Sequence, residues 1–134
     1  MKRLTAIIES ADNNYSAYIE GLDGVVATGS TIDEIKMNMA EALEFFIEGC
    51  RDMGCEIPDE LKEDYEIDFR MDVKSLLEMF SGIFTKAGLE RITGINQKQL
   101  WHYANGKTKP KPTQRQKIEN AIHKLGDELI RIRL

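Results

Sequence analysis

Long apolar runs and cysteine-rich segments are both missing from this 134-residue chain. No run approaches the roughly 18 apolar residues that a membrane span requires, and the N-terminus becomes polar after Ile8. We therefore expect neither a membrane helix nor a signal peptide. Cys50 and Cys55 are too few for a disulfide framework and have no second Cys or His pair at zinc spacing. These absences predict a cytoplasmic protein with two free thiols.

Histidine is equally scarce, which limits the chemistry open to the chain. His102 and His123 are the only two histidines, and neither has a cysteine nearby. A metal site or a histidine general base is therefore not expected. The sequence predicts no catalytic residue, no metal and no cofactor.

The net charge of −5 conceals two oppositely charged parts. Residues 1–72 carry 6 Lys and Arg against 18 Asp and Glu, a net charge of −12. Residues 73–134 carry 12 Lys and Arg against 5 Asp and Glu, a net charge of +7. Because a chain of this length can form two small domains, we predict an acidic domain over 1–72 and a basic domain over 73–134. The basic domain is the candidate for binding phosphate backbones.

Residues 1–72 show strand periodicity on both sides of one long helix. We predict four strands, at Leu4–Glu9, Tyr15–Glu20, Val25–Thr28 and Tyr65–Met71. Asp12–Asn14 and Gly21–Gly24 supply the turns between the first three strands. The buried face of the second strand is expected to carry Tyr15, Ala17 and Ile19.

The long helix is predicted from Ile32 to about Met53. Thr31 stands three residues before Glu34, the spacing of a capping box, and Gly54 marks the end. Apolar residues recur at helical spacing along it: Ile32, Ile35, Met39, Ala42, Leu43, Phe46, Ile47 and Cys50. The order β-β-β-α-β predicts an antiparallel sheet with one helix across a face, and so an α+β fold.

This half of the chain resembles the HicB family of antitoxins, which carry a small, partial RNase-H-like domain of the same order. The matching stretch runs Gly21-Leu22-Asp23-Gly24-Val25-Val26-Ala27-Thr28-Gly29-Ser30-Thr31-Ile32-Asp33-Glu34, and the likeness covers roughly residues 4–71. Val25 stands where many relatives have cysteine, and Asp23 where proline is common. In HicB systems the partner is HicA, a small basic toxin that cleaves mRNA. The resemblance implies that residues 1–72 cover a HicA-like toxin.

An RNase-H-like fold also raises the question of nuclease chemistry, in which paired carboxylates hold Mg²⁺. Glu9, Glu20 and Asp68 lie in predicted strands, but most other acids lie on the helix surface or in the 56–66 loop. We interpret the acidic residues as a solvated face that recognises a basic partner. The simpler alternative is that they only aid solubility.

Residues 73–134 show the spacing of four helices. The first is predicted at Lys74–Phe84 with Asp72 as its N-cap, and the last runs from Thr113 to about Leu125. Between them lies Lys86–Ile92, whose buried side is expected to comprise Ala87, Leu89 and Ile92. Gly94 then supplies a turn, and Asn96 can cap the third helix. Two helices joined by such a turn form a helix-turn-helix, whose second helix enters the DNA major groove.

The third helix is expected to turn Leu100 and Tyr103 inward. Its outward face would comprise Gln97, Lys98, Trp101 and His102, with Gln99 at the edge. Gln suits adenine and Lys suits guanine, so this face fits base readout. Trp101 is the exception, because packing against a neighbouring helix or subunit is the commoner role for tryptophan.

Asn105-Gly106 ends that helix and opens a basic segment. Lys107, Lys109, Lys111 and Arg115 are expected in a loop held extended by Pro110 and Pro112, where they suit phosphates. A solvated turn is the simpler alternative.

The run Gly94-Ile95-Asn96-Gln97-Lys98-Gln99-Leu100-Trp101-His102-Tyr103-Ala104-Asn105-Gly106-Lys107-Thr108-Lys109-Pro110 resembles the XRE or phage-repressor type of helix-turn-helix. The resemblance implies that Gln97, Lys98 and His102 face bases, while Asn105 and Lys107 meet the backbone. The candidate DNA-contacting set is Asn96, Gln97, Lys98, Gln99, His102, Asn105, Lys107 and Lys109. Glu90 stands where relatives have alanine at the crossing of the two helices, and Ala104 replaces a usual glutamate.

The chain end, Asp127–Leu134, is apolar enough to pair with another subunit and fits either a strand or a helix. We therefore expect a homodimer or homotetramer on DNA. The leading interpretation is an antitoxin of a type II toxin-antitoxin system that also represses its own operon. The alternative is a transcriptional regulator whose N-terminal domain senses a small ligand, and an RNase comes third.

Overall fold

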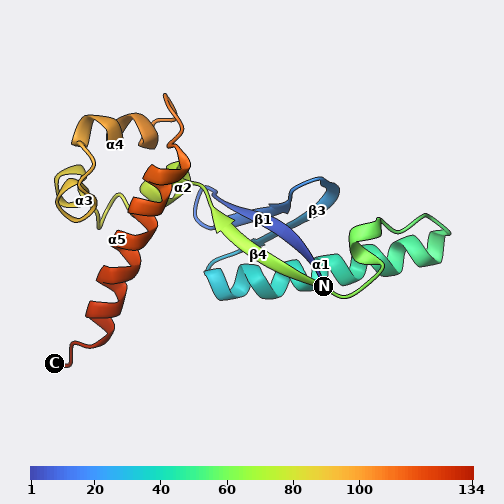
Figure 1. Ribbon diagram of the computed structural model, residues 1–134. Coiled ribbons are helices and arrows are strands. Elements are labelled where there is room, and N and C mark those ends of the chain that lie inside the picture. The colour runs from blue at the N-terminus through green and yellow to red at the C-terminus, as the bar shows by residue number, and fades with distance from the viewer. The chain divides into compact units, whose positions relative to one another are not determined.

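Four strands and five α-helices, described over residues 1–134 of the computed structural model, form an α+β protein (Figure 1). The chain divides into two compact units, Met1–Asp72 and Val73–Leu134. The division falls at the residue where the sequence changes from acidic to basic. Each unit has its own core, and the two are described separately.

The N-terminal unit contains one sheet with the strand order β3-β2-β1-β4. All four predicted strands are confirmed, although their ends differ by up to three residues. Tyr15, Ala17 and Ile19 are buried together as predicted. The bounds are β1 Lys2–Ser10, β2 Tyr15–Ile19, β3 Leu22–Gly29 and β4 Tyr65–Met71.

The sheet is mixed, so the prediction of an antiparallel sheet is wrong for its last strand. β4 pairs in parallel with β1, from Lys2 opposite Tyr65 to Ile8 opposite Met71. The cause is the helix α1, Ile32–Met53, which follows β3 and carries the chain back to the end of the sheet where β1 and β3 begin. β4 therefore runs in the same direction as β3 and β1. Alternating apolar residues carry no information about this direction.

The turn between β2 and β3 is also shorter than predicted. It occupies Glu20 and Gly21 rather than Gly21–Gly24, and β3 already begins at Leu22. Gly21 has a φ of 76°, which a residue without Cβ adopts at little cost. The register shifts between Tyr18 and Ile19, so that Ile19 stands opposite Leu22.

Helix α1 covers one face of the sheet and has the predicted ends. The Thr31 hydroxyl accepts a hydrogen bond from the N–H of Glu34 at 3.1 Å, and Gly54 ends the helix in the left-handed conformation. Its buried residues are Ile35, Met39 and Leu43. The side chains that they meet from the sheet are the alternate, inward-facing ones of the strands, chiefly Leu4, Ala6, Ile8, Ala17, Val25 and Ala27.

Gly29, where β3 meets α1, is expected to tolerate no side chain. A Cβ there would lie 2.9 Å from the backbone nitrogen of Ile35, so Gly29→Ala should lower the free energy of unfolding by about 1 to 3 kcal/mol. Gly49→Ala, in open space on α1, is the matched control and should stabilise by about 0.5 to 1 kcal/mol. Urea unfolding followed by circular dichroism measures both, and equal effects would contradict the close approach.

The C-terminal unit consists of four helices around a small core. They are α2 Val73–Met79, α3 Lys86–Thr93, α4 Gln97–Ala104 and α5 Pro112–Ile130. The buried residues of the core are Val73, Leu77, Leu89, Ile95, Leu100, Tyr103 and Ile118. Ala87 is exposed, so its predicted burial is wrong, while the predicted burial of Leu89 is confirmed.

Two helix ends in this unit differ from the predictions. α2 ends at Met79, five residues before the predicted Phe84, and the chain continues through turns closed by bonds such as Phe84 N–H to Phe80 C=O at 2.8 Å. Gly82 lies in these turns, where its low helix propensity favours the early end. α5 extends past Leu125 to Ile130, which decides the open choice for residues 127–130 in favour of helix.

Candidate nucleic-acid interface

Helices α3 and α4 are joined by three residues, Gly94–Asn96. Gly94 has a φ of 76° and donates its N–H to the carbonyl of Glu90, as predicted for a left-handed helix end. The Thr93 hydroxyl accepts from the N–H of Ile95 at 3.1 Å and donates to the carbonyl of Leu89 at 2.6 Å. Ile95 is buried in the core. The turn is therefore fixed by hydrogen bonds on both sides of its glycine and by one apolar anchor.

The N-terminus of α4 is capped twice. Asn96 accepts from the N–H of Lys98 at 2.8 Å, which is the predicted N-cap. Glu90, from the previous helix, accepts from the N–H of Gln97 at 3.0 Å. Two of the four free N–H groups at this helix start thus have side-chain partners. In the sequence Glu90 stands out only as a departure from alanine. No sequence signal beyond a carboxylate shortly before the helix indicates its capping role.

Glu90 also contacts the side chain of Gln97, a candidate base-reading residue. Its second carboxylate oxygen accepts from the Gln97 amide nitrogen at 3.4 Å. Such a contact orients the amide while leaving its carbonyl oxygen and one N–H for other partners.

The two faces of α4 differ as the sequence predicted. Leu100 and Tyr103 are buried in the core, whereas Gln97 and Lys98 are exposed and Trp101 keeps 55% of its surface exposed. Trp101 is thus not part of the core of this unit. Gln99, at the edge, donates to the hydroxyl of Thr108 at 3.4 Å.

His102 differs from the expectation of an outward-facing side chain. It is half-buried, and its Nδ1 is enclosed without a hydrogen-bond partner. Its ring stands edge-on to Trp101, with 5.5 Å between centroids. A contact from His102 to a ligand would therefore have to be made through Nε2. The helical spacing could not reveal this, because enclosure of one ring nitrogen depends on the side chains that surround it.

The segment after Asn105 turns back toward the end of α4. The side chain of Asn105 accepts from the N–H of Lys107 at 2.9 Å, and the carbonyl of His102 accepts from the N–H groups of Lys107 and Thr108 at 3.0 and 3.4 Å. Gly106 has a φ of 79°. These bonds hold the start of the basic segment against the end of α4.

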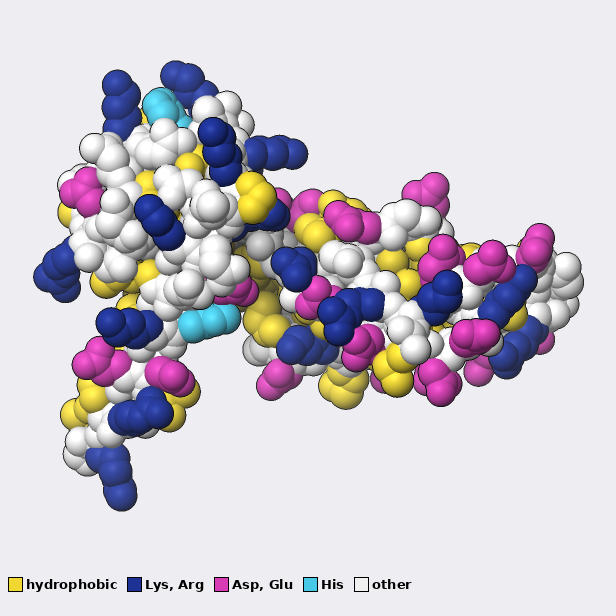
Figure 2. Space-filling view, viewed as in Figure 1, with side chains coloured by type: hydrophobic (Ala, Val, Ile, Leu, Met, Phe, Trp, Pro, Cys, Tyr) yellow, Lys and Arg dark blue, Asp and Glu magenta, His cyan; other side chains and the backbone are white.

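The basic segment is shorter than predicted. Pro112 is the first residue of α5 rather than a loop residue, and Arg115 lies in the first turn of that helix. Proline at the first helical position loses no hydrogen bond there, which explains the early start. Lys107, Lys109 and Lys111 are exposed in the loop. Figure 2 shows Lys and Arg side chains projecting from the end of this unit that carries α4.

Replacing Glu90 with alanine is expected to lower the free energy of unfolding of the C-terminal unit by about 0.5 to 2 kcal/mol, because the N–H of Gln97 loses its cap. Glu119→Ala, on the exposed surface of α5, removes the same side chain and should change stability by less than about 0.5 kcal/mol. Urea unfolding followed by Trp101 fluorescence compares them. Equal stability of the two variants would show that the cap contributes nothing.

The carboxylates considered for nuclease chemistry do not converge. Asp68 pairs with Arg70 at 2.8 Å in β4, and no group of three His, Cys, Asp or Glu side chains is arranged to hold a metal ion. Cys50 and Cys55 are both free. None of the helices combines the length and the apolar character needed to cross a membrane.

Comparisons with protein-family models, with curated proteins and with solved structures gave no significant match to this chain.

Proposed function

We propose that this chain is a cytoplasmic antitoxin of HicB type. Its N-terminal unit, interpreted as a partial RNase-H-like domain, would bind and neutralise a HicA-like toxin that cleaves mRNA. Its C-terminal unit, interpreted as an XRE-like helix-turn-helix, would bind operator DNA and repress the operon. The proposal rests on the sequence resemblance together with the geometry of each unit.

The observation that carries the DNA-binding part is the exposed start of α4. Two caps fix this helix, Leu100 anchors its inner side, and Gln97 and Lys98 remain exposed for base edges. Exposed lysines follow directly in the loop, where they would meet phosphates. A net charge of +7 on this unit favours association with nucleic acid.

The toxin-binding part is supported by the charge of the N-terminal unit. A net charge of −12 attracts a basic protein and repels nucleic acid. The N-terminal unit would therefore bind a protein partner, while the C-terminal unit binds DNA.

A second copy of the chain is the proposed partner of the apolar chain end. Leu129, Ile130, Ile132 and Leu134 are all exposed. Their burial between copies would give the homodimer or homotetramer that two operator half-sites, about 34 Å apart, require.

A ligand-sensing regulator remains the second candidate. The N-terminal unit has two hollows, one of about 200 Å³ beside β1 and one of about 470 Å³ between β3 and α1. The second lies within the roughly 300 to 1,000 Å³ typical of small-molecule sites, which is the observation in favour of a metabolite.

Co-expression with the adjoining gene tests the proposal. We expect that gene to encode a small basic protein that co-purifies with this chain and cleaves RNA only when released from it. The complex or the free chain should also protect a site in its own promoter from nuclease digestion. A neighbour that neither binds this chain nor cleaves RNA would refute the antitoxin function. Promoter protection that responds to a metabolite would favour the sensor instead.

A further inference from the structure

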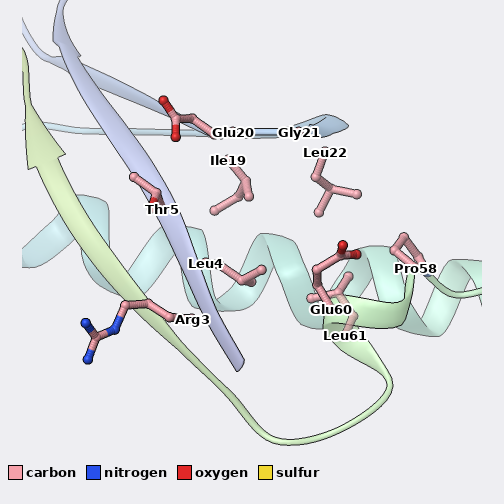
Figure 3. Close-up of a pocket in the computed structure, with 10 residues that line it drawn as sticks. All are labelled: Arg3, Leu4, Thr5, Ile19, Glu20, Gly21, Leu22, Pro58, Glu60 and Leu61. Atoms are coloured by element: carbon pink, nitrogen blue, oxygen red, sulfur yellow. The ribbon is translucent and has the colours of Figure 1, made fainter. Parts of the chain in front are cut away.

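A cavity opens in the N-terminal unit at the end of the sheet where β2 stops (Figure 3). Its apolar lining comes from four elements and the residue before the last of them: Leu4 of β1, Ile19 of β2, Leu22 of β3, Leu61 of the short 3₁₀ helix η1, Asp59–Leu61, and Pro58. Figure 3 shows Ile19 and Leu22 pointing into this space from one side and Glu60 from the other. The volume of about 200 Å³ suits one long side chain rather than a whole small-molecule ligand.

Strand β1 presents unpaired backbone to the same cavity. The ladder between β1 and β2 ends at Ala6 opposite Ile19, and one further bond joins the N–H of Glu20 to the carbonyl of Thr5 at 2.9 Å. Alternate residues of a strand direct their N–H and C=O to the same side. Two residues before Thr5, Arg3 therefore also directs its N–H and C=O toward the side where β2 lies. β2 has by then turned away at Gly21. The N–H and C=O of Arg3 therefore have no neighbouring strand on this side.

The charges around the opening are unbalanced. The guanidinium of Arg3 points away from the cavity and pairs with Glu66 at 2.7 Å, a contact that raises the pKa of Arg3. Lys62 pairs with Asp59 at 3.0 Å. Glu20 and Glu60, which line the opening, have no basic partner. Arg3 and Lys62 are thus paired with carboxylates, while Glu20 and Glu60 remain available.

We propose that this cavity anchors an extended, basic segment of the protein partner, with one Lys or Arg side chain inserted. The identity of that partner as the toxin rests on the function proposed above. The aliphatic stem would lie against Leu4, Leu22 and Leu61, and the charged end would reach Glu60. Glu20, whose carboxylate points away from the cavity in Figure 3, would meet a further cation of the same segment. The backbone of the segment would pair with Arg3 and so extend the sheet beside β1.

The first test is binding of the full chain to the small basic protein encoded beside it. The pair of changes Glu20→Gln and Glu60→Gln should weaken the complex about tenfold, because the basic segment loses both carboxylate partners. Glu48→Gln with Glu63→Gln removes the same charge from exposed positions outside the cavity and should change the affinity less than about twofold. An equal loss in both pairs would overturn the anchor and leave only a general effect of charge.

The second test does not depend on that partner. A capped tripeptide, Val-Arg-Val, should shift the amide resonances of Arg3, Leu22 and Leu61 of the full chain, and Val-norleucine-Val should not. Absence of these localised shifts at millimolar peptide refutes the anchor whatever the partner is. Localised shifts without binding of the adjoining gene product would support the anchor and count against the antitoxin function.

Discussion

Replacing Leu100 with alanine is expected to lower the free energy of unfolding of the C-terminal unit by about 2 to 5 kcal/mol. Leu100 is fully buried, and it joins α4 to the core formed by Leu77, Leu89 and Ile118. A unit of this size has a total stability of only about 3 to 9 kcal/mol, at roughly 0.05 to 0.15 kcal/mol per residue. The variant should therefore lose much or all of its folded C-terminal unit, and DNA binding with it.

Urea unfolding followed by fluorescence isolates this effect, because Trp101 is the only tryptophan and belongs to the affected unit. Ile83→Ala is the control in the same unit. Ile83 keeps 73% of its surface exposed, so truncating it should cost less than about 0.5 kcal/mol. Comparable destabilisation by the two variants would mean that Leu100 does not occupy the core position described for it.

The second large effect is expected on DNA recognition. Changing Gln97 and His102 to alanine should remove discrimination between operator and unrelated DNA, at about 1 to 3 kcal/mol for each base that is no longer read. Changing Lys107 and Lys109 to alanine should instead weaken both DNAs alike, because these lysines would meet phosphates. The slope of log K against log salt concentration should then become shallower by about 2, close to 1 for each lysine.

Titrations of both double variants with operator and unrelated duplexes, at several salt concentrations, separate the two effects. Testing Gln97→Ala and His102→Ala singly is informative because His102 is half-buried and can contribute only through Nε2. Most of the reduction in discrimination is therefore expected from Gln97. Unchanged discrimination in the Gln97 and His102 double variant would refute the assignment of α4 as the reading helix.

Local sequence signals predicted the elements of this chain well. The capping spacing of Thr31 and Glu34 located the start of α1, and Gly54 and Gly94 marked helix ends that the structure reproduces. Apolar spacing also identified Leu100 and Tyr103 as inward-facing. Each of these features depends on contacts within a few residues, which is why a single sequence contains them.

Features that depend on distant residues were predicted poorly or not at all. The direction of β4 depends on where α1 delivers the chain, and alternation of apolar residues is the same in both directions. The capping role of Glu90 depends on two helices meeting at a defined turn, so helix periodicity does not specify it.

The candidate site was predictable as a set of exposed polar residues but not as an arrangement. Gln97, Lys98 and Lys107 are exposed as expected, while the contact of Glu90 with Gln97 and the position of Arg115 in the first turn of α5 emerged only in three dimensions. The cavity beside Leu4 and Leu61 left no sequence signal, because its lining comes from segments far apart in the chain.

The parallel pairing of β1 with β4 also sets the order in which the chain can fold. The paired residues are 63 positions apart, as in the contact of Arg3 with Glu66, so loop-closure entropy must be overcome before this pairing contributes stability. Until Met71 has left the ribosome, β1 lacks its last neighbour and keeps a free edge that can pair wrongly with other chains or be cut by proteases. The residues furthest apart in the core of α2–α5 are Val73 and Ile118, 45 positions apart, so packing these helices closes shorter loops. The first strand to be synthesised, β1, therefore has the longest delay between its synthesis and its pairing with its last neighbour, β4.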